Sequence, residues 1–188
     1  RILKPDGSTY IGNFKNGLLH GFGLLQLPDE TTSIGEWLNG SLHGRGRHAC
    51  ADPNYEVYIG DFVKGVPTGC GRITNSDGSQ YIGYVLNNKP HGTGRCVWPD
   101  SSSYLGEWNN GKKQGYGISI LSDGSSYVGS YNNDLKEGKG KFTAADLSFF
   151  YIGEWFENMK HGKGYCVYPG IESKVRIFHG EWHENTKM

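Results

Sequence analysis

Aromatic residues alternate with glycine at a regular interval along this chain. Tyr10-Ile11-Gly12-Asn13-Phe14 sets the pattern, in which an aromatic residue, a glycine and a second aromatic residue are each two positions apart. Eight units open at Tyr10, Ser33, Tyr58, Tyr81, Tyr104, Tyr127, Tyr151 and Phe178, at steps of 23, 25, 23, 23, 23, 24 and 27 residues. Because alternate residues of a β-strand face the same side, each run predicts a strand with two rings on one face and a gap between them.

The rest of each unit predicts a turn and a second strand. Counting the opening residue as step 0, glycines recur at steps 11 and 13, as in Gly115 and Gly117. Step 7 holds only Gly, Asn or Asp, the residues that tolerate the positive φ of a tight hairpin turn. A second turn follows, often Asp-Gly, as in Asp123-Gly124. Each unit is therefore expected to be a two-stranded hairpin, which must stack on its neighbours to bury its rings.

These elements predict an all-β protein, an elongated single-domain solenoid of antiparallel β-hairpin repeats. Residues 1–9 match the second half of a truncated repeat, residues 10–177 hold seven repeats, and residues 178–188 hold an incomplete C-terminal repeat. The truncated first repeat leads us to expect further sequence upstream. The longer 25- and 27-residue steps predict irregular loops before Tyr58 and Phe178.

The composition indicates that the core is built mainly of aromatic rings. Hydrophobic residues make up 36% of the chain, aromatic residues 13%, and glycine accounts for 30 of 188 residues. An ordinary core needs more aliphatic residues, and the regular spacing argues against disorder. We expect rings packed over glycine backbone, with a structural core of Tyr10, Phe14, Trp37, Tyr58, Phe62, Tyr81, Tyr104, Trp108, Tyr127 and Tyr131.

The pattern Tyr-x-Gly-x-Trp/Phe-x-x-Gly-x-x-His-Gly-x-Gly resembles the MORN repeat (membrane occupation and recognition nexus). The run from Tyr151 through Gly164, with His161, is a close example. Departures are Ser33 and Val85 for aromatic residues, and Thr68, Gln114 and Glu137 for the histidine. The resemblance is strongest to the all-repeat MORN proteins of apicomplexan and trypanosomatid parasites. It implies a cytoskeletal scaffold that forms homodimers through its C-terminal repeats.

Charge narrows the classes of partner. The formal net charge is zero, from 19 basic and 19 acidic side chains, which argues against binding nucleic acid through its phosphates. Step 14 carries basic residues and step 3 acidic ones. With a turn near step 8 these columns would face each other, as Glu36–Arg47 and Asp61–Arg72. Such pairs would neutralise the basic column and weaken the case for lipid binding.

Histidine and cysteine offer the main alternative chemistry. His20, His43, His91 and His161 recur with the repeat, so we expect them to bond local backbone. The zinc candidates are His48, Cys50, Cys70, Cys166 and His179. A structural zinc needs four ligands, and neither candidate cluster supplies four unless two copies share the ion at a dimer interface. No cofactor is required, and no nucleophile–base arrangement predicts an enzyme.

The leading hypothesis is a structural scaffold and protein-interaction module, cytoplasmic and associated with the cytoskeleton or a membrane. We expect protein partners along the hairpin face, where Val97, Trp98, Ile118, Ile120, Val167 and Tyr168 are candidates to line a groove. The expected homodimer interface comprises Tyr151, Trp155, Tyr168, Phe178 and Trp182. Two alternatives remain open: direct binding of acidic phospholipid headgroups, and a role as the targeting segment of a longer enzyme.

Overall fold

The computed structural model describes residues 1–50, 56–168 and 176–187, and every regular element in these ranges is a β-strand. The predicted all-β class is confirmed: each strand pairs antiparallel with the next strand along the chain. The two predicted irregular loops fall on residues 51–55 and 169–175, which lie outside the described residues. Backbone contacts divide the chain into two compact units, Arg1–Gly94 and Arg95–Met188, with the boundary inside β9.

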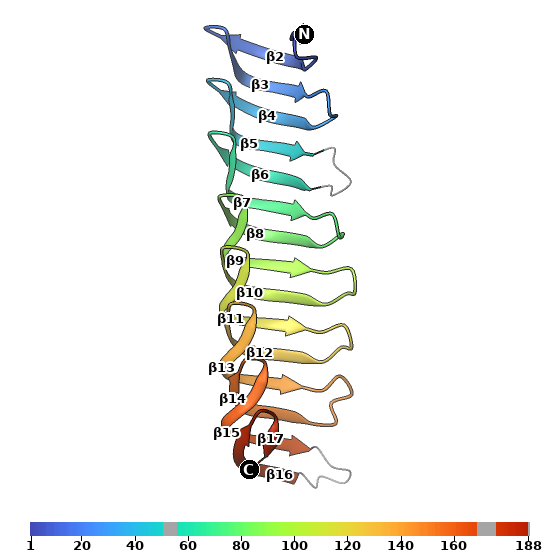
Figure 1. Cartoon of the computed structure of the whole chain (residues 1–188), viewed down its shortest axis with the longest axis vertical. Coiled ribbons are helices and arrows are strands. Elements are labelled where there is room, and N and C mark those ends of the chain that lie inside the picture. The colour runs from blue at the N-terminus through green and yellow to red at the C-terminus, as the bar shows by residue number, and fades with distance from the viewer. Residues whose placement is uncertain (51–55, 169–175, 188) are drawn as a thin grey trace. The chain divides into compact units, whose positions relative to one another are not determined.

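The hairpins of each unit follow one another in chain order (Figure 1). Unit 1 contains β1 (Ile2–Leu3), β2 (Thr9–Lys15), β3 (Leu18–Gln26), β4 (Thr32–Leu38), β5 (Ser41–Ala49), β6 (Val57–Val63), β7 (Val66–Thr74), β8 (Gln80–Leu86) and most of β9 (Lys89–Val97). Unit 2 contains β10 (Ser103–Asn109), β11 (Lys112–Ile120), β12 (Ser126–Asn132), β13 (Leu135–Thr143), β14 (Phe150–Phe156), β15 (Met159–Tyr168), β16 (Arg176–His183) and β17 (Thr186–Lys187).

A two-residue turn at steps 6 and 7 closes each hairpin. Asn110 and Gly111 both have positive φ, +50° and +84°, which is the signature of a type I′ turn. The same conformation recurs in later repeats, where step 7 is Asp134 or Asn158. The predicted role of step 7 is confirmed, because the Gly, Asn and Asp residues that stand there have positive φ.

A β-bulge sets the register of each hairpin. In the β10–β11 pair, Gly106 lies opposite Gly117 but Trp108 lies opposite Lys113, so the longer second strand has extra residues between them. One of these, Gly115, has a φ of +64°, which a side chain would strain.

This register corrects the predicted charge pairs. Because the chain turns at steps 6 and 7, and the bulge adds only two residues, step 14 lies opposite step 1. Arg47 therefore pairs with Ile34, and Arg72 pairs with Ile59. The cross-strand pairs Glu36–Arg47 and Asp61–Arg72 expected from the sequence are wrong.

Successive hairpins are joined by turns of a second kind. In the turn after β11, the backbone of Gly124 donates to the carbonyl of Leu121, and Leu121 donates to Ser125 across the turn. The Asp123 carboxylate accepts hydrogen bonds from both the backbone and the hydroxyl of Ser125, at 2.8 and 2.6 Å. This aspartate–serine arrangement holds the link between repeats in one conformation.

The core consists of tyrosine rings lying over glycine. Tyr104 is wholly buried, and a Cβ placed on Gly117 would collide with its ring. Its hydroxyl donates to the carbonyl of Glu107 at 2.9 Å. The edges of the ring meet Trp108 of its own hairpin and Tyr131 of the next, each with centroids 5.1 Å away. One ring thus fills the gap over the glycines and also binds two hairpins together.

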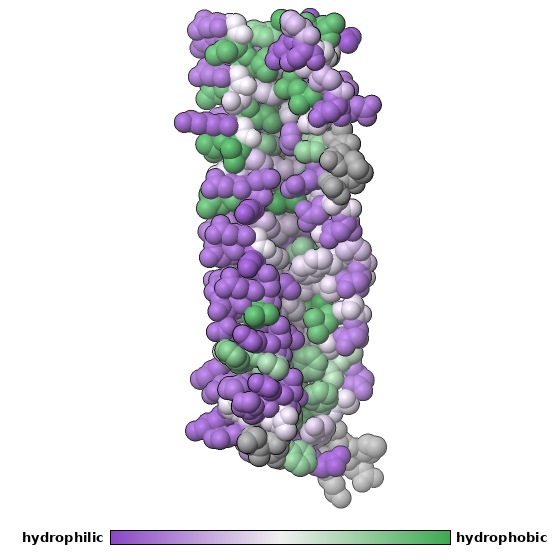
Figure 2. Space-filling model, viewed as in Figure 1, coloured by the Kyte–Doolittle hydropathy of each residue, from purple (hydrophilic) through white to green (hydrophobic). Residues whose placement is uncertain are grey.

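Nine of the ten predicted core residues are buried, and Phe14 is the exception at 40% exposed. A second ring such as Trp155 packs against two tyrosines, Tyr151 of its own repeat and Tyr127 of the repeat before it. Among the described residues, the ring contact of Phe14 is with Tyr10, with centroids 5.1 Å apart. Away from the rings, Figure 2 shows apolar side chains interspersed with polar ones on the visible face.

Candidate interaction surfaces

Each unit presents two faces with different side chains. The inner face carries the tyrosines of step 0, the rings of step 4 and the residues of steps 9 and 15. The outer face carries steps 1, 3, 12 and 14. Every tyrosine at step 0 is at most 2% exposed, whereas Ile59 and Ile82 at step 1 are about half exposed. The outer face is therefore accessible to partners, whereas the tyrosine rings of the inner face are not.

Isoleucine and arginine alternate across the outer face of unit 1. Cross-strand neighbours run from Ile34 to Arg47, then Ile59, Arg72 and Ile82. We call these five residues the Ile–Arg row. Adjacent strands are about 4.8 Å apart, so successive isoleucines of the row are about 10 Å apart with an arginine between them.

Two adjoining hollows follow the Ile–Arg row. The first has a volume of about 450 Å³ and lies between Phe22, Ile34, Arg47 and Ile59. The second, of about 660 Å³, continues past Ile59 to Ile82. Glycines at steps 2, 11 and 13 contribute only backbone to these hollows. The depth of the surface therefore comes from the same glycines that admit the tyrosine rings on the opposite face.

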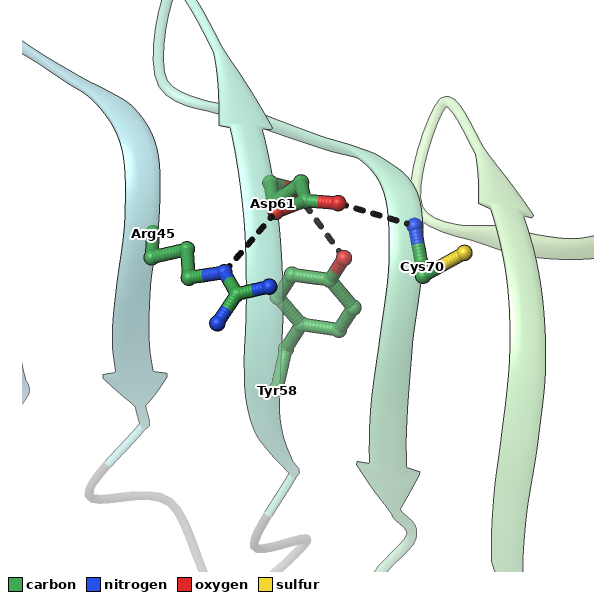
Figure 3. A network of polar contacts seen from close by, with 4 residues as sticks. All are labelled: Arg45, Tyr58, Asp61 and Cys70. Atoms are coloured by element: carbon green, nitrogen blue, oxygen red, sulfur yellow. Dashed lines mark hydrogen bonds and ion pairs between the residues drawn. The ribbon is translucent and has the colours of Figure 1, made fainter.

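A carboxylate beside the first hollow links three strands (Figure 3). Asp61 on β6 lies 3.9 Å from the guanidinium of Arg45 on β5, and accepts a hydrogen bond from the backbone of Cys70 on β7 at 3.1 Å. The hydroxyl of Tyr58 donates to the carbonyl of Asp61 at 3.0 Å. The thiol of Cys70 points away from the carboxylate (Figure 3) and is exposed. These contacts fix the edge of the hollow.

A column of lysines lies on the inner face of unit 2. Step 9 is Leu19, Leu42, Pro67 and Pro90 in unit 1 but Lys113, Lys136 and Lys160 in unit 2. Sequence reasoning overlooked this column, although the recurrence of lysine at step 9 in three successive repeats is a visible signal. We call these three residues the lysine column.

Each ammonium of the lysine column lies over three aromatic rings. Lys113 Nζ is 4.7 Å from the ring centroid of Trp98 and 5.1 Å from that of Tyr104. Lys136 Nζ is 5.2 Å from Tyr127, and Lys160 Nζ is 5.0 Å from Trp182. All four distances are within the range of a cation–π interaction. The lysine stems cover rings that would otherwise face solvent.

Burial lowers the pKa of two of these lysines. Desolvation lowers the pKa of Lys113, and the Asp134 carboxylate opposes that change. Desolvation also lowers the pKa of Lys136, and the positive charge of Lys113 lowers it further. In the part of the chain that the structure describes, no carboxylate lies within 4.0 Å of an ammonium of the column. The column is therefore a set of half-buried ammoniums, of which Lys113 and Lys136 are close enough to affect each other's charge.

The structure brings together one pair of the zinc candidates. The thiol of Cys50 lies 3.5 Å from His48 Nε2, and His48 Nδ1 lies 2.8 Å from the Ser33 hydroxyl on the inner face. Cys70 is on the outer face of the sheet and does not approach them. Cys166 pairs with Phe178 on the inner face, whereas His179 packs against Tyr165 on the outer face. Within the described ranges, no group of three or more His, Cys, Asp or Glu is placed to hold a metal ion.

The histidines of the repeat stand on the second strand, as expected, but do not all form the expected bonds. The Nδ1 atoms of His20 and His91 are buried without a hydrogen-bond partner. The ring of His161 instead packs against Phe156 and His183, with centroids 5.7 and 5.5 Å apart.

The five residues expected at a dimer interface divide into two groups. Tyr151 and Trp155 are buried at 0% and 6% exposure, so they belong to the core. Tyr168 and Phe178 are 36% and 44% exposed, with their ring centroids 5.6 Å apart. Trp182 is partly buried against Tyr151, and its indole N–H has no hydrogen-bond partner.

The apolar residues expected to line one groove lie on both faces. Ile118 and Ile120 are exposed on the outer face, whereas Trp98 lies on the inner face beneath Lys113. Val167 is buried at 7% exposure. They therefore do not form a single groove.

The geometry defines a repeat protein built from antiparallel β-hairpins, and comparison with known proteins agrees. The MORN repeat model matches residues 10–32, 34–52, 58–80, 81–103, 104–126, 127–148 and 151–170, so the chain belongs to the MORN-repeat family. No curated protein sequence matches the chain. MORN repeats are modules that interact with proteins and membranes.

A solved structure shares the fold at low sequence identity. It is the TCP domain of SAS-4 (dCPAP) from Drosophila melanogaster, in complex with a proline-rich motif of Ana2 (dSTIL). The TM-score is 0.52 with 12% identity, over 96% of this chain and 95% of that one. Separately, the described residues include no helix long and apolar enough to span a membrane.

Proposed function

We propose that the chain is a protein-interaction scaffold whose Ile–Arg row binds an extended segment of a partner protein. The observation that carries this proposal is the pair of adjoining hollows along half-exposed isoleucines with arginines between them. Isoleucines about 10 Å apart suit apolar side chains at every third residue of a peptide in the polyproline II conformation, which turns once every three residues and rises about 3.1 Å per residue. The arginines favour acidic residues between them. The similar TCP domain also holds a peptide segment, which supports this type of partner.

Peptide selection followed by matched substitutions tests this proposal. Peptides selected from a displayed library on the intact chain are expected to carry spaced apolar residues with acidic neighbours. Ile59→Glu, which places a carboxylate in both hollows, is expected to weaken their binding at least tenfold. Ile118→Glu is the control, because Ile118 is similarly exposed on the outer face of unit 2. Equal loss in both variants, or no selected peptide, would contradict the proposal.

We also propose that the chain forms homodimers through its C-terminal repeats. Exposure of Tyr168 and Phe178, two large apolar rings in contact, favours this surface. The double variant Tyr168→Ser and Phe178→Ser is expected to be monomeric in light scattering where the parent chain is a dimer. A monomeric parent chain would refute self-association.

A scaffold with these surfaces would organise assemblies in the cytoplasm, on the cytoskeleton or at a membrane. Direct binding to acidic phospholipid headgroups is the competing function. Co-sedimentation of the chain with phosphatidylserine vesicles at low salt, unaffected by Ile59→Glu, would favour it over peptide binding. A shared zinc ion at the dimer interface remains a proposal that metal analysis of the purified dimer would test.

A further inference from the structure

From the lysine column on the inner face of unit 2, we infer a second binding site that takes an acidic, extended peptide with a carboxylate at every third residue. This site differs from the Ile–Arg row in unit, face and chemistry. The proposal therefore stands whether or not the Ile–Arg row binds a partner.

The ammoniums of the column are set at a fixed spacing. Successive lysines stand on β11, β13 and β15, two strand spacings apart, so the ammoniums recur at about 10 Å. The backbone at each lysine is held by the next hairpin turn in both directions. The backbone N–H of Lys113 donates to the Asp134 carboxylate at 2.8 Å, and the backbone carbonyl of Lys113 accepts from the backbone N–H of Asp134 at 3.0 Å. Asn158 holds Lys136 in the same way, with distances of 2.9 and 3.1 Å.

Within the described residues, no carboxylate forms an ion pair with an ammonium of the column. The rings beneath each ammonium offer it their π faces. The nearest influential carboxylates are already engaged, since Asp134 accepts from the Lys113 backbone and Asp123 accepts from Ser125. A carboxylate arriving from a partner would meet a partly desolvated ammonium, where a charge-assisted hydrogen bond is stronger than in open water.

A hollow at one end of the column gives the peptide room. It has a volume of about 430 Å³ and is bounded by Trp98, Asp100, Lys113, Ser119 and Leu121. The Asp100 carboxylate there accepts hydrogen bonds from the backbone and the hydroxyl of Ser102. An apolar residue or proline of the peptide would pack against Trp98 there while its acidic neighbour meets Lys113. Proline-containing peptides in the polyproline II conformation advance about 3.1 Å per residue, so every third side chain recurs at about 9 Å. This repeat matches the spacing of the lysines.

Recessed ammoniums favour a peptide over a membrane surface. The ammoniums lie close over ring faces, so a narrow extended chain can reach them more readily than a flat layer of headgroups. The formal net charge of zero also gives the molecule no general attraction to an anionic bilayer.

Titration of the intact chain with a labelled (Glu-Pro-Ser)4 peptide tests the inference. Binding that weakens with added salt is expected, and (Gln-Pro-Ser)4 is expected not to bind. The triple variant Lys113→Met, Lys136→Met and Lys160→Met keeps stems over the rings but removes the charges. We expect it to bind (Glu-Pro-Ser)4 at least tenfold more weakly. The control triple variant replaces Lys139, Lys141 and Lys163, on the outer face of the same unit, by Met and is expected to change binding less than threefold.

Circular dichroism checks that both triple variants remain folded. If the inner-face triple variant does not fold, the single variant Lys136→Met is used in its place and is expected to weaken binding at least threefold. Equal losses in the two triple variants would indicate general electrostatics and overturn the inference. So would failure of the parent chain to bind (Glu-Pro-Ser)4, or binding only to phosphatidylserine vesicles. Retained binding in the inner-face variant would show that the lysines only cover the rings.

Discussion

The ring of Tyr104 and the bare backbone of Gly117 occupy one shared space. No side chain can be added at Gly117 unless the ring moves, and the ring is held by its hydroxyl bond and by two neighbouring rings. The same contact recurs wherever the opening residue is tyrosine, for example at Tyr58 over Gly71 and Tyr127 over Gly140. The stability of each repeat therefore depends on this tyrosine–glycine contact, where a single added methyl group would collide with the ring.

We expect Gly117→Ala to lower the free energy of unfolding by about 1–3 kcal/mol or more, because the new methyl group overpacks the Tyr104 ring. Urea denaturation measures the change. Gly111→Asn is the control in the same repeat. Gly111 has positive φ, nothing lies within 4 Å of an added Cβ, and asparagine already occupies this position in other repeats. A loss below about 0.5 kcal/mol is expected there, and similar losses in both variants would contradict the packing explanation.

At the scale of the element, the turns that link hairpins depend on a repeated aspartate–serine contact. Hydrogen bonds from the serine side chain and then from its backbone lower the pKa of Asp6, Asp77, Asp100, Asp123 and Asp146 below the usual 3.8. A carboxylate whose pKa is lower in the folded state stabilises that state at pH values above the unfolded pKa. That stabilisation is lost as the pH falls through the folded pKa.

The free energy of unfolding should therefore fall as the pH decreases from about 5 to 2, and these turns contribute to that fall. Replacing Asp77, Asp100 and Asp123 together by asparagine removes three titrating groups while keeping a side-chain acceptor. We expect a shallower pH dependence in that variant than in the parent chain, measured by urea denaturation at several pH values. An unchanged slope would show that other carboxylates dominate.

At the scale of the whole molecule, stability is distributed repeat by repeat. The main contacts between strands join strands that are consecutive in the chain, and the residues form two compact units. In a protein of this kind, a local defect opens its neighbours and leaves distant repeats in place. The two units also present different surfaces, an apolar and arginine-lined outer face in one and a lysine-lined inner face in the other.

We expect Gly71→Ala in unit 1 to increase amide hydrogen exchange in β6, β7 and β8. Exchange in β12 to β15 of unit 2 should stay unchanged, because the disturbed contacts are with adjacent strands only. Gly140→Ala should give the reverse pattern in hydrogen-exchange mass spectrometry. Uniform acceleration over both units by either variant would mean that the chain opens as one cooperative body.

The repeat, the strands and the turns are determined by the sequence because their causes are local. Alternation places the rings on one face, and the residues of step 7 permit positive φ wherever they stand. The buried tyrosines followed from the same alternation. The exposure of Phe14 did not, because it depends on packing between repeats: one described ring meets Phe14, whereas Trp155 lies between two tyrosines.

The tertiary structure alone decided which charges meet. A bulge between Gly106 and Trp108, repeated in other hairpins, shifts the register by two residues, and nothing in the spacing of the charges reveals it. That shift placed Arg47 between isoleucines and left Asp61 to contact Arg45 of the preceding hairpin. The lysine column recurs visibly in the sequence, but its rings come from several strands and from the turns beside them. Only their packing shows that its charges lie half-buried over aromatic faces.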